Sequence, residues 1–455
     1  MKKPLALALA LSLLLGAAGA MAETTLKLGI YPIDTDERGV ETHENTFIPA
    51  FEAAHPDVTI ERAPYDFNLQ TILPLLESGN APSVITTYFT EIPKLAGNDF
   101  LEDITDILEE RGWLEQINPA IIGPSSYGGR VYGVPRNFYG MGMMLNVELF
   151  EEAGLVDENG VPLYPKTWDE FVETAVSIKD ETGAAGFVLL GADNAAGWHF
   201  TILSWSFGAR MQTLEDGKWI AHLNDEPVVK ALQLVKDLKW EYDALTADPT
   251  AENWATGFQQ LGTGAAAMYM AADDAVSQPT ANYGLPIDKL MMIGMPAGPA
   301  GTVMLTGGNL FVFPKGTSKD EINAALDYLE IMGYAPVVSD IAREGRIADY
   351  ESNVANGIPV MKGLNVWTNE EYNAMIDELY ARYVNVDPAL YASYYEAATQ
   401  PGALRAEEPM QTQDMYAELT KALQAVVVDA NADPQALLDI AQANFQALLD
   451  EQVNK

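Results

Sequence analysis

Short apolar runs alternate with longer amphipathic runs at the start of the chain, and this alternation restricts the fold more than any other feature. Three of the apolar runs have the length and composition of strands: Thr25–Tyr31, Asp57–Arg62 and Ser83–Tyr88. The two segments between them are predicted to be helices, the first ending at His55 and the second at Gly79. Strands joined through helices of this length pair in parallel, so the sequence predicts an α/β fold.

The length of the chain indicates more than one hydrophobic core. The sequence has 455 residues, of which 48% are hydrophobic, and this is not the composition of a disordered chain. Single cores stop growing at about 250–300 residues. We therefore expect the chain to form two lobes.

Residues 1–22 have the features of a secretory signal peptide. Lys2 and Lys3 form a basic start, and Leu5–Ala18 is an apolar run too short for the roughly 20 residues that a membrane span needs. An A-x-A cleavage signal ends at Ala22. We expect this segment to be removed when the protein is exported.

The sequence contains no cysteine. Disulfides, thiolate metal sites and a cysteine nucleophile are thereby excluded. The acylated cysteine that anchors exported lipoproteins to a membrane is excluded too. An export signal without this cysteine predicts an extracytoplasmic protein, either free in a periplasm or held at the cell envelope in another way.

The charge of the chain excludes one large class of partner. The sequence has 65 acidic and 26 basic residues, which gives a formal net charge of −39. Such a surface repels nucleic acid and anionic lipid and favours solubility. We therefore expect no nucleic-acid partner.

The segment Val131–Gly183 contains two helices with clear boundaries. Val147–Ala153 is predicted to be the first. The second is announced by Thr167, with Glu170 three residues later, which is the pattern of a capping box in which each side chain accepts from a backbone N–H. Gly183 is expected to end this helix.

A longer order of residues runs through the same segment. It reads YG-x-P, then L-N-x-x-L-F-x-x-A-G-L, then P-x-T-W-x-E-F, and its residues are Tyr132, Gly133, Pro135, Leu145, Asn146, Leu149, Phe150, Ala153, Gly154, Leu155, Pro165, Thr167, Trp168, Glu170 and Phe171. This order resembles the centre of family 1 of the extracellular solute-binding proteins of ABC importers, a family that includes many sugar-binding proteins.

Later segments resemble the same family. Trp254–Met270 contains the order F-x-x-x-G-x-A-A-M, and Thr306–Pro314 is a G-G-containing strand followed by a helix that Ser318 and Glu321 announce. The helical pattern of Asp433–Glu451 is typical of the C-terminal end of the family. The resemblance therefore extends over nearly the whole chain after the export signal.

The resemblance implies a periplasmic-binding-protein type II-like fold, with two α/β lobes joined by a hinge of crossing strands. The N-terminal lobe would be residues 23–135 plus 297–345, and the other lobe 136–296 plus 346–455. A solute bound between the lobes would favour their closed arrangement by its differential affinity for it. The closed form would deliver the solute to the transmembrane permease subunits of an ABC importer.

Motifs for other chemistries are incomplete. Gly262 and Gly264 match part of a dinucleotide fingerprint, but they follow a helical segment where the motif requires a strand. Asp34 and Asp36 resemble the start of a calcium loop, but Arg38 stands where a ligand is needed. The four histidines have no zinc-binding spacing. We expect no metal, no cofactor and no catalysis.

Candidate ligand contacts are aromatic and polar residues that directly follow or precede predicted strands. Sugars stack their apolar CH faces on aromatic rings and bind carboxylates, amides and arginine through their hydroxyl groups. The resemblance favours the loop after A-A-M and the G-G of the late strand. The candidates are Tyr31, Asp34, Tyr88, Arg136, Tyr139, Trp198, Trp205, Asp273, Asp274, Gly308, Asn309 and Trp367. The cluster of Met141, Met143 and Met144 is expected to pack in a core instead.

The sequence thus predicts a monomeric, exported binding protein for a carbohydrate, with an oligosaccharide favoured. Another polar solute remains open, since Arg136 would serve a phosphate and the pair Asp273 and Asp274 would serve an amine. A secreted glycan-cleaving enzyme is the alternative from a different class.

Overall fold

The computed structural model describes residues 24–34 and 36–455. The predicted signal peptide lies outside these residues. The described chain divides into two compact units: unit 1 extends to Ile85 and includes Phe313–Met332, and unit 2 consists of Thr86–Val312 and Gly333–Lys455. The lobe boundaries given above remain a prediction.

Unit 1 contains the parallel strands expected from the start of the sequence. β1 (Thr24–Leu28) pairs in parallel with β2 (Val58–Arg62), and Leu28 forms a parallel bridge to Val84. Helices connect these strands, as parallel pairing requires. The β-α-β prediction is confirmed. The helices of this unit are α1 (Glu37–Thr42), the π-helical turn η1 (His43–Phe47), α2 (Ile48–Ala54), α3 (Leu69–Glu77) and α13 (Lys319–Ile331).

The helix α13 begins as predicted. The Ser318 side chain accepts from the backbone N–H of Glu321, and the Glu321 carboxylate accepts from the Ser318 N–H. Both groups would otherwise be unpaired at the helix start. On the same unit, His43 Nδ1 lies 2.8 Å from the hydroxyl of Tyr328 on α13, so a buried polar contact holds η1 against this helix.

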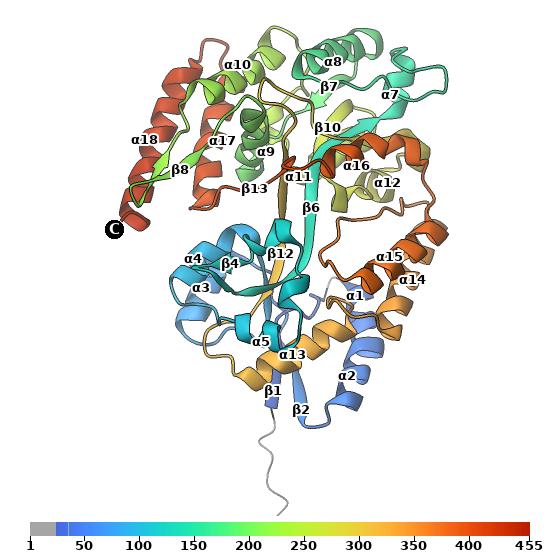
Figure 1. Cartoon of the computed structure of the whole chain (residues 1–455). Coiled ribbons are helices and arrows are strands. Elements are labelled where there is room, and N and C mark those ends of the chain that lie inside the picture. The colour runs from blue at the N-terminus through green and yellow to red at the C-terminus, as the bar shows by residue number, and fades with distance from the viewer. Residues whose placement is uncertain (1–23, 35) are drawn as a thin grey trace, which may run out of the picture. The chain divides into compact units, whose positions relative to one another are not determined.

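Unit 2 is built on a mixed sheet that the long strand β6 (Gly133–Asn146) organises (Figure 1). The order is β13–β12–β6–β10–β7, and β11 also pairs with β6. β10, β11 and β12 are antiparallel to β6, whereas β7 is parallel to β10 and β13 is parallel to β12. The bounds are β7 Ala185–Val188, β10 Ala266–Ala272, β11 Leu290–Ile293, β12 Met304–Val312 and β13 Leu404–Ala406.

β6 takes part in two ladders in succession. Its first part pairs with β12 from Gly133 to Gly140, and its second part pairs with β10 and β11 from Met141 to Asn146. The first ladder is interrupted: Asn309 lies opposite Asn137, but the next residue of β12 lies opposite Pro135. Arg136 is therefore the extra residue of a β-bulge.

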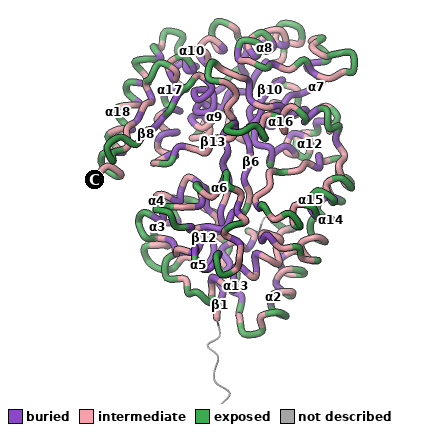
Figure 2. The backbone as a smooth tube through the Cα atoms, in the orientation of Figure 1, coloured by how far each residue is buried: buried purple, intermediate pink, exposed green. Residues whose placement is uncertain are grey.

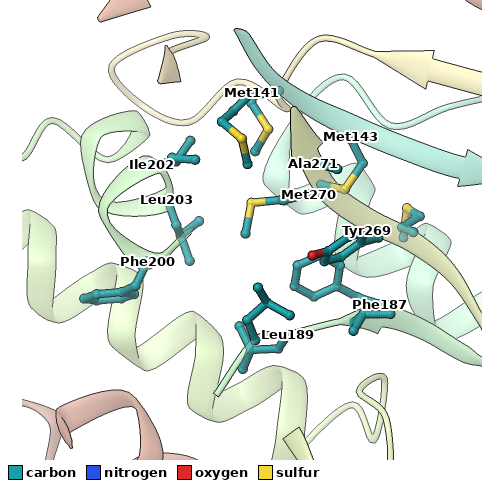
Figure 3. Close-up of a cluster of buried hydrophobic side chains, with 14 of the residues drawn as sticks. Met141, Met143, Phe187, Leu189, Phe200, Ile202, Leu203, Tyr269, Met270 and Ala271 are labelled. Carbon is teal, nitrogen blue, oxygen red and sulfur yellow. The ribbon is translucent and has the colours of Figure 1, made fainter. Parts of the chain in front are cut away.

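The main core of unit 2 lies against the second part of β6. Side chains from β6, β7, β10 and helix α9 (Asp193–Ser206) converge there, as Figure 3 shows for Met141, Phe187, Leu203 and Met270. Met141, Met143 and Met144 are each 0% exposed, so their prediction as core residues is confirmed. Figure 2 shows the same buried path along β6 and β10, with exposed residues on outer helices such as α18 (Pro434–Gln452).

Helix α8 (Trp168–Thr182) shows how far local sequence fixes a boundary. The Thr167 side chain accepts from the Glu170 N–H, as predicted, and Gly183 ends the helix with φ of 77°. The second half of the predicted capping box is wrong, because the Glu170 carboxylate accepts from the N–H of Lys166, one residue earlier than expected.

The remaining elements of unit 2 are mostly helices. Helix α9, which carries Trp198 and Trp205, was not among the predicted elements. The C-terminal segment is helical as predicted, apart from the short strand β13. The other elements are β3 (Ile85–Tyr88, at the boundary of the units), α4 (Ile92–Gly97), α5 (Thr105–Glu110), α6 (Pro119–Ile122), β4 (Ser126–Tyr127), β5 (Arg130–Val131), α7 (Val147–Glu152), β8 (Gln212–Glu215), β9 (Lys218–Ala221), α10 (Glu226–Trp240), α11 (Trp254–Gly262), α12 (Gln278–Tyr283), α14 (Asp340–Ala355), α15 (Glu370–Tyr383), α16 (Ala392–Ala398) and α17 (Thr412–Val428).

Side-chain amides of α18 replace a neighbouring strand along the open edge of β9. Gln442 accepts from the Leu223 N–H at 2.7 Å and donates to the Ala221 carbonyl at 2.7 Å. One turn further on, Gln446 accepts from the Ala221 N–H at 2.8 Å and donates to the Trp219 carbonyl at 3.2 Å. A helix thereby pairs the backbone groups that an edge strand would expose to another chain.

Among the residues that the structure describes, every helix is too short or too polar to cross a lipid bilayer.

Candidate functional site

Three polar side chains from three separate elements of unit 2 form a hydrogen-bonded row. Asp274 lies in the 3₁₀ turn that follows β10, Asn137 lies on β6 beside the bulge, and Asn309 lies opposite it on β12. The Asn309 amide donates to Asn137 Oδ1 at 3.0 Å, and the Asn137 amide donates to Asp274 Oδ2 at 2.9 Å. The structure therefore brings together two of the predicted residues, Asp274 and Asn309, through a third that the sequence analysis did not select.

Asp273 is buried at the base of this row. It is 6% exposed, and its Oδ1 accepts from the Gly140 N–H at 3.0 Å. The hydroxyl of Tyr394 donates to the Gly140 carbonyl at 3.1 Å, so both backbone groups of this residue are paired from the same direction. Burial and the neighbouring Asp274 raise the pKa of Asp273 to about 7. This carboxyl group is placed to hold β6 in position.

Asp274 differs from its neighbour in exposure. Its side chain is exposed, although the protein removes enough water around it to raise its pKa. The hydrogen bond from Asn137 and the charge of Arg136 act in the opposite direction and lower this pKa. The carboxylate of Asp274 is thus oriented by the protein and accessible to a solute.

Tyr139 lies on the same face of β6 as Asn137 and reaches the neighbouring strand. A Cβ at Gly307 would lie 2.3 Å from the Tyr139 hydroxyl oxygen and 3.1 Å from Glu407 Oε2, so both side chains occupy the space that this glycine leaves free. The Tyr416 hydroxyl donates to Glu407 Oε1 at 2.8 Å. Burial raises the pKa of Glu407 to about 7, and burial with the charge of Glu407 raises the pKa of Tyr139.

Aromatic side chains adjoin Tyr139. The ring of Trp198 lies 6.2 Å from that of Tyr139 at an interplanar angle of 84°, and 5.5 Å from the ring of Trp254. Trp198 is placed by a close approach of α9 to α17, since a Cβ at Gly197 would lie 2.1 Å from the Tyr416 carbonyl oxygen. The result is a series of three neighbouring aromatic rings, of which that of Tyr139 lies near the carboxyl groups.

Buried polar atoms without a partner occur in the same aromatic group. The indole Nε1 of Trp198 and both ring nitrogens of His199 make no hydrogen bond to the part of the chain that the structure describes. His199 is 0% exposed, and its ring contacts those of Trp198 at 5.1 Å and Tyr269 at 5.9 Å. Burial lowers the pKa of His199 to about 3, so the imidazole is neutral.

The other predicted contacts have different environments. Tyr88 is 47% exposed, and its proximity raises the pKa of Tyr139. Arg136 is exposed at the bulge. Gly308 leaves room for Phe89, whose ring atoms would lie 2.7 Å from a Cβ at this position.

Two predicted tryptophans are enclosed by protein. Trp205 is 1% exposed, donates to Glu408 at 3.0 Å and has the Arg405 guanidinium 4.0 Å above its ring. Trp367 is 2% exposed and packs edge-on against Trp113. Their role in solute binding stays a prediction.

The predicted residues Tyr31 and Asp34 belong to unit 1. The Tyr31 hydroxyl donates to Glu44 at 2.8 Å, and Glu44 also binds Arg62 through both carboxylate oxygens. Asp34 is exposed. Within unit 1, the contact with Glu44 fixes the orientation of the Tyr31 ring.

Three further residues of the site were not among the predictions. Asn137 follows Arg136 directly, and the sequence signal that would have found it is its place between the candidates Arg136 and Tyr139. Glu407 and Tyr394 come from the C-terminal segment, about 270 and 255 residues away from Tyr139 and Gly140 along the chain. Only the fold brings them together, so no local pattern could have indicated them.

No other chemistry is indicated by the arrangement of acidic and histidine side chains. In residues 24–34 and 36–455 they form no group that could hold a metal ion. The site offers carboxylate oxygens, amides and aromatic faces, which bind polar solutes.

Comparison with known proteins identifies the class. The family of bacterial extracellular solute-binding proteins matches residues 41–332, and the chain belongs to this family. A protein of Brucella abortus named as a binding protein is 26% identical over 294 residues, which are 62% of this chain and 66% of the length of that relative. The predicted family is therefore confirmed.

Solved structures show the fold. An ABC transporter solute-binding protein from Thermotoga lettingae, bound to α-D-tagatose, matches 94% of this chain and 100% of its own with a TM-score of 0.68 at 18% identity. UgpB from Mycobacterium tuberculosis, in complex with glycerophosphocholine, matches 94% and 98% with a TM-score of 0.68 at 17% identity. The predicted periplasmic-binding-protein type II fold is confirmed.

Proposed function

We propose that this protein is the substrate-binding component of an ABC importer and that it binds a carbohydrate at the polar row of Asp274, Asn137 and Asn309. The observation that carries the proposal is the juxtaposition of this row with the aromatic rings of Tyr139 and Trp198. A carbohydrate needs both kinds of surface, because its ring faces are apolar and its edges carry hydroxyl groups.

The placement of each group supports this role. Asp274 presents a carboxylate that Asn137 orients, and Arg136 adds a donor beside it. Asp273 acts on the strand rather than on the solute, because its carboxyl group accepts a hydrogen bond from the Gly140 N–H of β6. In this proposal Asp274, Asn309, Tyr139 and Trp198 contact the solute and Asp273 positions the strand that carries Tyr139.

The proposal includes the partners and location predicted from the sequence. The protein acts outside the cytoplasm as a monomer and passes its solute to the transmembrane permease subunits. The tagatose complex of the Thermotoga lettingae protein, which has the same fold, supports a sugar, and the glycerophosphocholine complex of UgpB shows that another polar solute is compatible with this fold.

A thermal-shift screen of the purified protein tests the proposal. The panel consists of mono-, di- and oligosaccharides, sugar phosphates, polyamines and amino acids. A ligand at 100 times its dissociation constant adds about 2.7 kcal/mol to the free energy of unfolding, which gives a readable rise in the midpoint. Midpoint shifts with carbohydrates are expected. Shifts confined to amino acids or polyamines would contradict the carbohydrate assignment.

Two variants test the location of the site. Asp274→Ala and Trp198→Ala are each expected to weaken carbohydrate binding at least about tenfold, because each removes a direct contact. Trp240→Ala serves as the control for the tryptophan change, since Trp240 is 45% exposed on α10 and donates to the Val426 carbonyl. Unchanged affinity in both site variants would place the solute elsewhere.

A further inference from the structure

The carboxylates of the candidate site are only partly balanced by basic side chains. Asp273, Asp274 and Glu407 all act on the hydroxyl group of Tyr139. The charge of Arg136 acts on Asp274. At Asp273 and Glu407, burial and a neighbouring carboxylate are the main unfavourable influences within the described chain. The carboxyl groups of the site therefore outnumber the basic side chains that act on them, and above about pH 7 the site carries an excess of negative charge.

The residue next to Glu407 shows that this excess is specific to the site. Glu408 is 5% exposed, and its carboxylate accepts from the Arg405 guanidinium at 2.9 Å and from the Trp205 indole at 3.0 Å. The carboxylate that faces away from Tyr139 is thus neutralised by an arginine. The one beside Tyr139 has a tyrosine hydroxyl as its partner instead.

Three hydrogen-bond donors of the site are directed at its own acceptors. The Asn309 amide donates to Asn137, the Asn137 amide donates to Asp274, and the Tyr416 hydroxyl donates to Glu407. Each carboxylate oxygen accepts more than one hydrogen bond, so these contacts leave acceptor capacity on Asp274. A solute that fills it has to supply donors, and an ammonium group supplies three together with a positive charge.

An independent observation points to a solute that also carries acceptors. Trp198 Nε1 is a buried donor without a partner in the described chain. The neutral ring of His199, which is 0% exposed and contacts that of Trp198, has one donor and one acceptor nitrogen, and both lack a partner there as well. An indole N–H is a donor only and needs an oxygen to accept from it. Hydroxyl and ring oxygens of a sugar provide such acceptors.

The aromatic rings suit both parts of such a molecule. The rings of Tyr139, Trp198 and Trp254 follow one another at 6.2 Å and 5.5 Å. Aromatic faces pack against the CH faces of a sugar, and they also attract a cation within about 6 Å of the ring centre.

We infer that the solute is an amino sugar, or a glycan containing one, whose free ammonium group binds at Asp274 while its ring oxygens and CH face meet Trp198. This inference rests on the proposed function and narrows it from carbohydrates to those with a positive charge. The acetylated form of the same sugar lacks the charge and two of the donors, and is expected to bind weakly.

Isothermal titration calorimetry of the purified protein with four probes tests the inference. The probes are the β-1,4 disaccharide of glucosamine, its N,N′-diacetyl form, cellobiose and spermidine. The first three share a linkage and differ at C2, where they carry an ammonium, an acetamide or a hydroxyl group. The glucosamine disaccharide is expected to bind at least about tenfold more tightly than the other two, since its charge meets a partly desolvated carboxylate.

Each other outcome has a defined meaning. Equal or tighter binding of cellobiose or the diacetyl form overturns the amino-sugar inference and leaves the proposed function standing. Binding of spermidine alone overturns both, since the carbohydrate is then unnecessary. If all four probes fail to bind while other carbohydrates raise the thermal midpoint, only the inference is overturned. Silence with every carbohydrate overturns the proposed function as well.

A matched pair of variants locates the charge preference. Asp274→Asn keeps the shape of the side chain and removes its charge, and it is expected to reduce the preference for the glucosamine disaccharide over cellobiose about tenfold or more. Asp216→Asn makes the same change in the exposed turn between β8 and β9 and is expected to leave the preference unchanged. The same preference in both variants overturns the assignment of the ammonium group to Asp274.

Discussion

Two regions of unit 2 differ in how completely their polar groups are hydrogen-bonded. One is the contact of α18 with β9, and the other is the end of β10 beside β6. On α18, Gln442 and Gln446 each donate and accept, so the edge of β9 is paired along its length. Beside β6, the neighbouring carboxyl groups of Asp273 and Asp274 are balanced only in part, by Arg136, and the Trp198 indole has no partner in the described chain. Both regions rely on side-chain amides, but only the first completes its hydrogen bonds within the protein.

This difference in hydrogen bonding indicates different roles: the polar groups at β9 stabilise the fold, whereas those at β6 can still bind another molecule. A buried polar group left unpaired costs about 1–3 kcal/mol, so a protein retains such groups where a ligand or another function offsets the cost. The paired edge of β9 needs nothing further. In the proposed function, the site at β6 completes its contacts when a solute with both donors and acceptors is bound.

The largest effect is expected where the site depends on close packing. In Gly197→Ala the new Cβ would meet the backbone of Tyr416, so α9 and α17 must separate. We expect a loss of roughly 3–4 kcal/mol in the free energy of unfolding, because backbone atoms cannot move aside as side chains do. Urea denaturation measures the loss.

Gly345→Ala on α14 is the control for this change. No heavy atom lies within 4 Å of a Cβ built there, and its backbone is helical. The variant should be stabilised by about 0.5–1 kcal/mol through the unfolded state. Equal behaviour of the two variants would mean that the contact of α9 with α17 does not place Trp198.

The paired region is tested by removing its amides. Gln442→Ala combined with Gln446→Ala deletes four hydrogen bonds to the backbone of β9 and Leu223. We expect a loss of roughly 2–3 kcal/mol at about 0.5–1.5 kcal/mol for each bond, with partial replacement by water.

Carbohydrate affinity should be unchanged in this double variant once the folded fraction is taken into account. Gln233→Ala controls for the loss of an exposed glutamine, since Gln233 bonds only its neighbour Asp237 on α10 among the contacts described, and its effect should be within about 0.5 kcal/mol. A change in affinity without a change in stability would contradict the division between the two regions.

The pH dependence of stability tests the carboxylates of the site. The pKa values of Asp273 and Glu407 are raised to about 7 in the folded protein, so the folded state binds protons more tightly than the unfolded state. Their contribution to stability is fully present below about pH 4 and is lost as the pH rises through about 7. Between pH 6 and pH 7 we expect a loss of roughly 2 kcal/mol from this pair.

Thermal or urea unfolding of Asp273→Asn combined with Glu407→Gln isolates this contribution. The remaining carboxylates also repel one another as the pH rises, and this repulsion is common to both proteins. The double variant should therefore show a shallower decline than the parent chain. Parallel curves would mean that neither carboxyl group titrates with a raised pKa.

The smallest effect on stability is expected at the amide of the site. Asn309→Ala removes one partly buried donor to Asn137 and should lower the free energy of unfolding by less than about 1 kcal/mol. Carbohydrate affinity should nevertheless fall several-fold, because Asn137 is then free to turn away from Asp274. The same kind of change thus affects stability on α18 and binding on β12. A fall in stability as large as that expected for the α18 variant, with affinity unchanged, would reverse this assignment.

The sequence predicted the fold where the structure is built from local patterns. The first strands and helices of unit 1 were predicted from short apolar runs that alternate with longer amphipathic runs. Thr167 and Gly183 marked the ends of α8, because capping residues act within one turn of a helix. Helix α9 was not predicted, since most of its faces are buried and it has no polar side to reveal its period.

The candidate site was predicted in part for a physical reason. Asp273, Asp274 and Tyr139 follow or lie on strands, and the carboxyl ends of strands are common positions for ligand contacts. The contact between Asn137 and Asp274 could not be predicted, because it depends on the register of β6 against β12. Glu407 was beyond sequence reasoning, because Tyr139, which it adjoins, lies about 270 residues away along the chain.

Because of the bulge at Arg136, the direction of the site's side chains depends on the number of residues in β6. Side chains of a strand alternate between its faces, so one residue more or less exchanges the faces for everything that follows. Deleting Arg136 would restore an even ladder with β12, but it would turn Asn137 and Tyr139 away from Asp274, or else carry Met141 out of the core. Another residue at position 136 would therefore keep this register, whereas removal of the residue would require a second one-residue change elsewhere in β6.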